Sequence, residues 1–188
     1  MKTLTMSALK SMLLLVAVLL FSQCDTAEPE AENEEELITT LEMTFTPVNG
    51  GDEVVFSVYD EDGDGPMAPV YTNGTLAANT AYTASIEVRN DVENENITLE
   101  VIEEANEHQF FFQISNGLNI EFGYNDADTD GYPIGLSTTF TTGAASTGSL
   151  VVILRHEADK LAEGVENGDP TNAGGETDIQ ATFDVVIE

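Results

Sequence analysis

The sequence predicts a mainly β protein, a single antiparallel, Ig-like β-sandwich of about eight strands with one short helix. Apolar and polar residues alternate over short runs, the period that buries one face of a strand. Clusters of Gly, Asn and Asp separate these runs, as turns separate antiparallel strands. Hydrophobic residues make up 41% of the chain, which indicates a folded core despite the many acids. We place this domain at residues 37–188.

The strands follow from these runs in chain order. Leu41, Met43 and Phe45 alternate with polar residues, and the turn sequence Asn49-Gly50-Gly51 leads to the next run. A second turn of this kind, Asn116-Gly117, predicts a hairpin in the middle of the domain. The predicted strands lie at 41–45, 54–58, 82–88, 110–114, 118–124, 136–141, 149–155 and 177–187.

One segment breaks the period of two. Ile97, Val101 and Ala105 repeat every four residues after Asn96, which is a good N-cap residue, and this predicts a helix over residues 98–107. Alternation of Ile97, Leu99 and Val101 would also suit a strand. We expect the long loop at 157–176 to cross the end of the sandwich.

The first 36 residues predict the location of the protein. Lys2 and Lys10 precede about ten apolar residues, which is typical of a secretory signal and too short to span a bilayer. We expect a signal peptide at 1–23, lipidation of Cys24, and a disordered acidic tether at 24–36. The tether is a spacer or a signal for export to the cell surface. These features predict an outer-membrane lipoprotein, on the periplasmic face or the cell surface.

The charge of the chain excludes one class of partner. With 35 acidic and 5 basic residues, the net charge of −30 leaves no basic surface for nucleic acid. Cys24 is the single cysteine, so no disulfide forms within the chain. Signatures of phosphate-binding loops, dinucleotide-binding turns and nucleophile elbows are absent. We therefore expect a protein that is not an enzyme. Besides the two functions given at the end of this section, a hydrolase is a third hypothesis, because carboxylates are plentiful.

Two acidic loops predict calcium sites. Each has the pattern D-x-D-x-D-G after a predicted strand, and alternating carboxylates can surround one hard cation. The twelfth loop positions are Tyr71 and Ser137, where an EF-hand needs Glu, so these are not EF-hands. The alternative is ordinary turns, in which Asp and Gly are common. The predicted calcium ligands are Asp60, Asp62, Asp64, Asp126, Asp128 and Asp130.

The two histidines predict a different metal site. By strand parity, His108 lies on the face of Phe110 and Phe112, and His156 on that of Leu154. Both therefore face inward at the rim of the sandwich, each beside a Glu in the sequence, Glu107 and Glu157 respectively. Two imidazoles and a carboxylate could bind zinc or copper. The alternative is two rim histidines that hydrogen-bond to backbone or acids.

Seven segments together resemble small Bacteroidota lipoproteins of unknown function, often labelled "type 1 periplasmic binding fold superfamily". These segments are 60–65 (DEDGDG), 68–70 (APV), 74–76 (GTL), 107–110 (EHQF), 133–136 (PIGL), 154–157 (LRHE) and 171–178 (TNAGGETD). The label implies a two-lobed α/β protein, which the β pattern contradicts, so we retain the family and not that fold. The resemblance implies an accessory lipoprotein that serves a TonB-dependent receptor system.

The sequence thus favours a lipid-anchored, non-enzymatic envelope protein that acts as a binding or accessory module with calcium-stabilised loops. Its partner would be a TonB-dependent receptor or a surface ligand. The alternative function is a zinc- or copper-binding lipoprotein that uses His108 and His156 in metal uptake.

Overall fold

The computed structural model describes residues 37–63 and 65–188. The strands are β1 (Thr40–Pro47), β2 (Val54–Tyr59), β3 (Val70–Thr72), β4 (Thr75–Leu76), β5 (Ala81–Arg89), β6 (Gln109–Ile114), β7 (Ile120–Tyr124), β8 (Ser137–Thr142), β9 (Ser146–His156) and β10 (Glu176–Ile187). The predicted signal peptide, the tether with Cys24, and Asp64 lie outside the described residues. Within the described part, no helix is both long and apolar enough to span a membrane.

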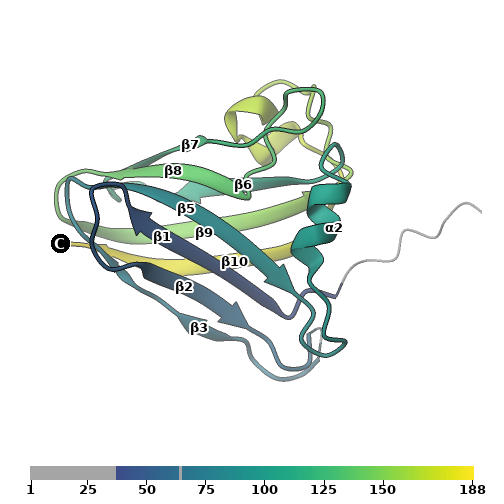
Figure 1. Ribbon diagram of the computed structural model, residues 1–188, viewed down its shortest axis with the longest axis horizontal. Helices are drawn as coiled ribbons and strands as arrows, with labels where there is room; N and C mark the ends of the chain where they lie inside the picture. The colour runs from purple at the N-terminus through teal and green to yellow at the C-terminus, as the bar shows by residue number, and fades with distance from the viewer. Residues whose placement is uncertain (1–36, 64) are drawn as a thin grey trace, which may run out of the picture. The chain divides into compact units, whose positions relative to one another are not determined.

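Two sheets pack face to face as a β-sandwich (Figure 1). The larger sheet has the order β3-β2-β1-β5-β8-β7, and the smaller one the order β4-β10-β9-β6. Every pair is antiparallel except β10 with β4. The prediction of a mainly β, antiparallel sandwich is confirmed, with ten strands in place of eight. The two additional strands, β3 and β4, are too short to show alternation in the sequence.

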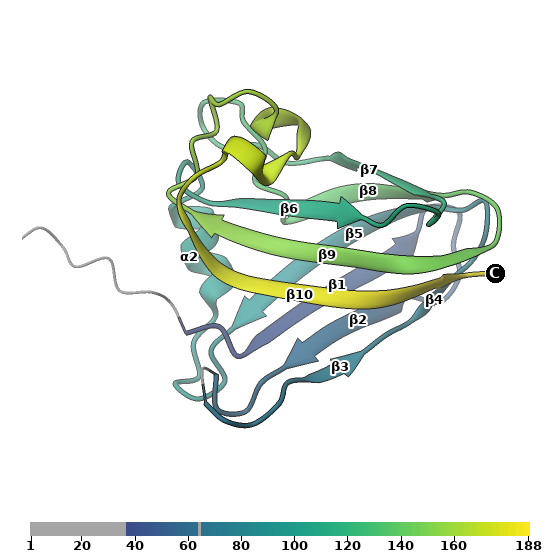
Figure 2. The same cartoon turned by 180° about the vertical axis from the view of Figure 1, so that it is seen from behind.

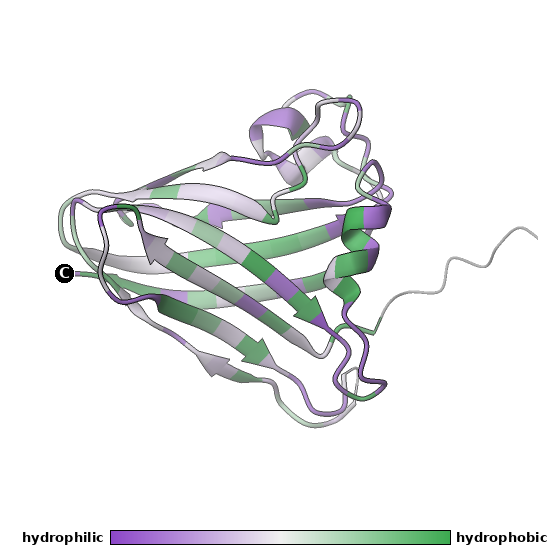
Figure 3. Cartoon of the chain, in the orientation of Figure 1, coloured by the Kyte–Doolittle hydropathy of each residue, from purple (hydrophilic) through white to green (hydrophobic). Residues whose placement is uncertain are grey.

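Alternating apolar side chains fill the space between the sheets, and polar residues lie in the loops (Figure 3). Aromatic rings connect the two layers. Phe112 of β6 meets Phe140 of β8 with ring centroids 5.5 Å apart, and Phe56 of β2 meets Phe183 of β10 at 5.6 Å. Each such edge-on or tilted pair adds about 0.5–1.5 kcal/mol to the free energy gained by burial.

The helix α2 (Ile97–Glu103) lies across one end of the sandwich (Figure 1). The Asn96 side chain caps it by accepting from the backbone N–H of Thr98, and Ile97 and Val101 are buried against the core. The helix ends four residues before the predicted limit of 107. There the Glu104 carbonyl accepts hydrogen bonds from the backbone N–H groups of both Glu107 and His108, so the chain turns into β6.

The loop between β9 and β10 does not simply cross the end of the sandwich. It contains two 3₁₀ turns, η1 (Val165–Asn167) and η2 (Pro170–Asn172), and folds back beside β6 (Figure 2). Its Val165 and Ala173 pack against Phe111 and Ile153 on the outer face of the smaller sheet, which makes a second apolar cluster. The sequence did not indicate this, because Phe111 and Ile153 have the parity of outward-facing residues.

The return of this loop to β10 requires glycine at one position. Gly174 and Gly175 both have positive φ, +59° and +63°, yet only Gly175 is crowded. A Cβ at Gly175 would lie 2.0 Å from the His156 carbonyl oxygen, whereas one at Gly174 would meet nothing within 4 Å.

The two glycines therefore provide a matched pair of substitutions. We expect Gly174→Ala to lower the free energy of unfolding by about 1–2 kcal/mol, the cost of a left-handed backbone. Gly175→Ala should lower it by about 2–5 kcal/mol, because the clash with His156 adds to that cost. Urea unfolding of the two variants measures the difference, and equal losses would contradict the close approach.

Candidate metal centre

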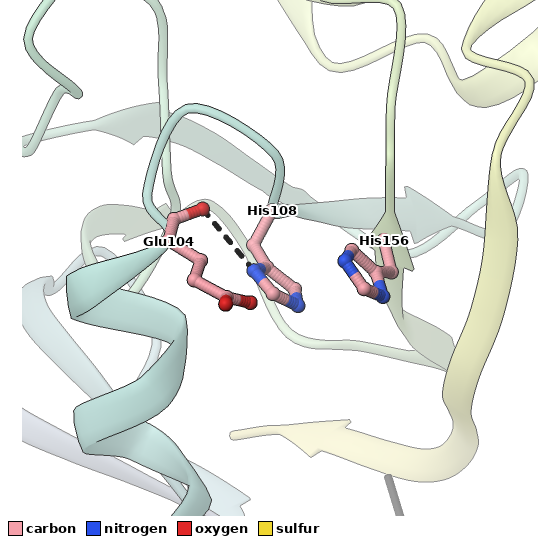
Figure 4. A group of neighbouring side chains, drawn as sticks. All are labelled: Glu104, His108 and His156. Atoms are coloured by element: carbon pink, nitrogen blue, oxygen red, sulfur yellow. Dashed lines mark hydrogen bonds between the residues drawn. The ribbon is translucent and has the colours of Figure 1, made fainter. Parts of the chain in front are cut away.

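His108 and His156 face each other across two neighbouring strands. β6 and β9 pair antiparallel with Gln109 opposite Arg155, so the positions just beyond that pair are opposite as well. The two imidazole rings are stacked, with centroids 4.4 Å apart and planes 12° from parallel. The residues predicted to share a site are therefore adjacent, at the rim of the sandwich nearest α2 (Figure 4).

Hydrogen bonding decides which nitrogen of His108 carries the proton. Its Nδ1 lies 3.2 Å from the backbone carbonyl oxygen of Glu104, which only accepts, so a neutral ring donates from Nδ1. The Nε2 atom then presents a lone pair. The residue is fully buried, and its Nε2 has no hydrogen-bond partner within residues 37–63 and 65–188. Burial lowers the pKa of His108, which favours the neutral ring that a metal requires.

Three carboxylates surround the pair. A ligand atom from each of Glu104, His108 and His156 lies within 4.8 Å of the other two (Figure 4). Glu107 Oε2 is 3.6 Å from His156 Nε2, so the Glu107 carboxylate lies beside the histidine that is distant from it in sequence. Asp178 Oδ2 is 3.9 Å from His108 Nε2. Glu157, expected beside His156, is an exposed residue at positive φ.

The rings as they stand are not yet arranged around one ion. A metal lies in the plane of each imidazole that binds it, and two parallel, stacked planes do not share such a point. One ring must turn. The hydrogen bond to Glu104 holds His108, whereas the His156 side chain is 10% exposed and ends a strand. His156 is therefore the ring that can rotate toward a shared ion.

The second acidic loop, which contains Asp126, Asp128 and Asp130, already binds a cation of the protein itself, the ammonium group of Lys160. Lys160 is 5% exposed, and its ammonium donates to Asp128 Oδ2 at 2.8 Å and to the carbonyl oxygens of Ala105 and Pro133. All three ammonium protons are thus used. Burial lowers the pKa of Lys160, and Asp128 opposes that effect. Burial alone would raise the pKa of Asp128, but hydrogen bonds from Lys160 and the Tyr132 N–H bring it below its usual value.

The other carboxylates of this loop are also hydrogen-bonded. Asp126 accepts from the backbone N–H groups of Gly135 and Ser137, and Asp130 accepts from the Asn106 side chain. A calcium ion here would compete with these donors and with Lys160. The calcium prediction for Asp126, Asp128 and Asp130 stays a prediction, with this competitor now identified.

The carboxylates of the first acidic loop, which contains Asp60 and Asp62, are less fully hydrogen-bonded. Asp62 Oδ2 accepts from the Met67 N–H at 3.2 Å, and Asp60 Oδ1 is 3.4 Å from the Asp62 N–H. The other oxygen of Asp62, Oδ1, is buried and has no hydrogen-bond partner among the described residues. A buried anionic oxygen without a donor is a position that a cation would stabilise.

Sequence reasoning missed two members of the histidine centre. Glu104 stands four residues before His108, a spacing that could have indicated it. Asp178 had no such signal, because its approach to His108 depends on how β10 pairs with β9.

Comparison with known proteins adds no relative, since no family model, curated protein or solved structure matches the chain. The resemblance to Bacteroidota lipoproteins, with the partners and location that it implies, stays a prediction.

The buried ion pair yields a prediction about stability. Lys160→Met should lower the free energy of unfolding by about 3–5 kcal/mol, because it leaves the Asp128 carboxylate buried without a counter-ion. Asp128→Asn keeps an acceptor for the backbone N–H groups and removes the charge. The double variant should therefore be more stable than Lys160→Met alone, as a double-mutant cycle in urea with EDTA will measure.

The same pair has a pH signature. The folded-state pKa of Asp128 lies below its ordinary value of 3.8. Its contribution to stability is therefore present above pH 3.8 and is lost as the pH falls through the folded-state pKa. Asp128→Asn should lack this loss on the acid side. A loss for Lys160→Met below 1 kcal/mol would contradict the assigned role of the pair.

Proposed function

We propose that this chain is a lipid-anchored, non-enzymatic envelope protein whose β-sandwich binds a divalent transition metal, zinc or copper, at His108, His156 and Glu104. The observation that carries the proposal is the meeting of the only two histidines of the chain, from different strands, beside a carboxylate. Imidazole nitrogen and carboxylate oxygen are ligands of Zn²⁺ and Cu²⁺.

The surroundings support binding rather than catalysis. The ligands come from the end of α2 and from two paired strands, so a rigid frame holds them. The surplus of acidic residues gives the protein a negative field that attracts cations. For the biological task, we propose metal handling at the envelope, in the service of the TonB-dependent receptor system that the resemblance implies.

Thermal unfolding of the purified full chain tests this proposal. Zinc or copper at about 100 times its Kd should stabilise the protein by about 2.7 kcal/mol, which raises Tm by roughly 5–10 °C. His156→Ala should abolish the shift, because it removes a ligand. Glu157→Gln, a change at the exposed neighbour, should retain it. No shift with either metal, or a shift that survives both His156→Ala and His108→Gln, would contradict the proposal.

A second candidate function is calcium binding by the first acidic loop, favoured by the buried Asp62 Oδ1. Such an ion would fix the loop and reduce repulsion between its carboxylates. The second loop is the natural comparison, because Lys160 supplies its cation.

Calcium should therefore raise Tm through the first loop alone. Asp62→Asn should eliminate the increase and Asp130→Asn should leave it intact, as calcium titrations followed by thermal unfolding will show. A calcium shift that persists in Asp62→Asn, or none in the unmodified chain, would exclude the first loop as the site.

A further inference from the structure

The outer edge of β10 is open over part of its length. In the smaller sheet β10 lies between β9 and β4, but β4 pairs with it only at Val186 and Ile187 (Figure 2). At the other end, the shift in register between Thr177 and Ile179 ends the regular ladder with β9. Residues 179–183 therefore pair with β9 on one side and, within the described part of the chain, with no strand on the other.

Hydrogen bonds near the C-terminus show which backbone groups of β10 face the open edge. Asp184 donates its N–H to the Asn73 side chain, and Glu188 donates its own to a carbonyl of β4. Because backbone groups alternate in direction along a strand, those of Gln180 and Thr182 point to the same side. Both residues are exposed, so their N–H and C=O groups can accept a further strand.

A groove of about 340 Å³ lies beside this edge, where the larger sheet continues past β10 with β2 and β3. Ile179 and Gln180 line it from the smaller sheet, and Val58 and Tyr71 line it from the larger one. Tyr71 is 39% exposed, although its ring packs edge-on against Phe183 with centroids 5.8 Å apart. An extended segment in the groove would find backbone partners on β10 and apolar side chains beside them.

The charges around the groove select its occupant. The bordering segments 54–72 and 176–188 contain four acids each and neither Lys nor Arg, and Asp60 lines the groove itself. A second copy of the chain, with its own net charge of −30, would be repelled, as would the acidic residues 25–36 of the same chain. A basic segment would be attracted.

We propose that β10 accepts an added strand from a basic, extended segment of another protein, which pairs with Gln180 and Thr182 and places apolar side chains against Tyr71. Strand addition takes its affinity from main-chain hydrogen bonds and its specificity from pockets for alternate side chains. Residues 179–183 contain no proline and no charged residue, the features that commonly protect a strand edge from pairing.

The dimensions of the edge define the partner further. Five residues of strand span roughly 16 Å, so the partner contributes a strand of about four to six residues. Apolar residues at every second position would face the groove, with Lys or Arg between them in the negative field of the chain. This interaction does not require a metal at the histidine centre.

Amide hydrogen exchange of the full chain, followed by NMR with EDTA present, tests the proposal. In the free protein, the amides of Gln180 and Thr182 should exchange rapidly, and those of Ala181 and Phe183, which face β9, should exchange slowly. The probe is an acetylated octapeptide of alternating lysine and valine. Its addition should slow exchange at Gln180 and Thr182 by at least about 10-fold and leave the amides of β7, another edge strand, unchanged.

Two matched peptides separate strand pairing from simple charge attraction. The same peptide with every second amide N-methylated keeps its charge but cannot complete the ladder, and it should give no protection. An octapeptide of alternating glutamate and valine should not bind. Equal protection by the N-methylated peptide, or none by the lysine–valine peptide, would overturn the proposal. Slow exchange of Gln180 and Thr182 in the free chain would also overturn it, because the edge would then already be occupied.

Variants of the chain provide a second test. Thr182→Pro removes an N–H that faces away from β9 and should abolish peptide-induced protection at Gln180. Asp60→Asn should weaken binding of the lysine–valine peptide by roughly 2–5-fold, the effect of one exposed charge pair. Asp52→Asn, the same change in the turn between β1 and β2, is the matched control and should bind as the unmodified chain does. Full protection in a folded Thr182→Pro variant would contradict pairing at this edge.

Discussion

The antiparallel pairing of β6 with β9 is the constraint on which the centre depends. Its register places Gln109 opposite Arg155, and this fixes His108 opposite His156. The same pairing aligns the inward rows of both strands, so the apolar core and the histidine pair arise from one pattern. A shift of one residue in either strand would turn its histidine and its core side chains to the other face, which a buried sheet does not tolerate. The register therefore fixes the backbone positions of both histidines as firmly as those of the core residues, while the His156 side chain can still rotate.

Two carboxylates at this end of the sandwich are stabilised in different ways. Asp126 accepts backbone hydrogen bonds, and Asp128 pairs with the buried ammonium of Lys160. The connection from α2 to β6 links the Lys160–Asp128 pair to the histidine centre. In this connection the Ala105 carbonyl accepts a hydrogen bond from Lys160, and the Glu104 carbonyl accepts one from His108. The acidic loop thus supports the segment that carries Glu104.

The sequence predicted what depends on local pattern. Alternation located the eight longer strands, and parity placed His108 and His156 on inward faces. Four features could not be predicted from the sequence, because they depend on tertiary contacts. The helix stops at Glu103 because the Glu104 carbonyl turns the chain into β6. Phe111 is buried by a loop that returns over the outer face, and Asp178 reaches His108 only through a bulge. Lys160, far from the acidic loop in sequence, gave no sign that it would pair with Asp128.

Nitrogen-15 NMR of the two imidazoles, in the full chain with and without zinc, tests the central claim most directly. With only two histidines, each ring gives its own set of long-range correlations. In the metal-free protein, His108 should show the neutral ring protonated on Nδ1. Stoichiometric zinc should shift the nitrogen resonances of both rings together, and calcium should leave them unchanged. Rings that do not respond to zinc or copper, or a response confined to one histidine, would contradict a shared metal site.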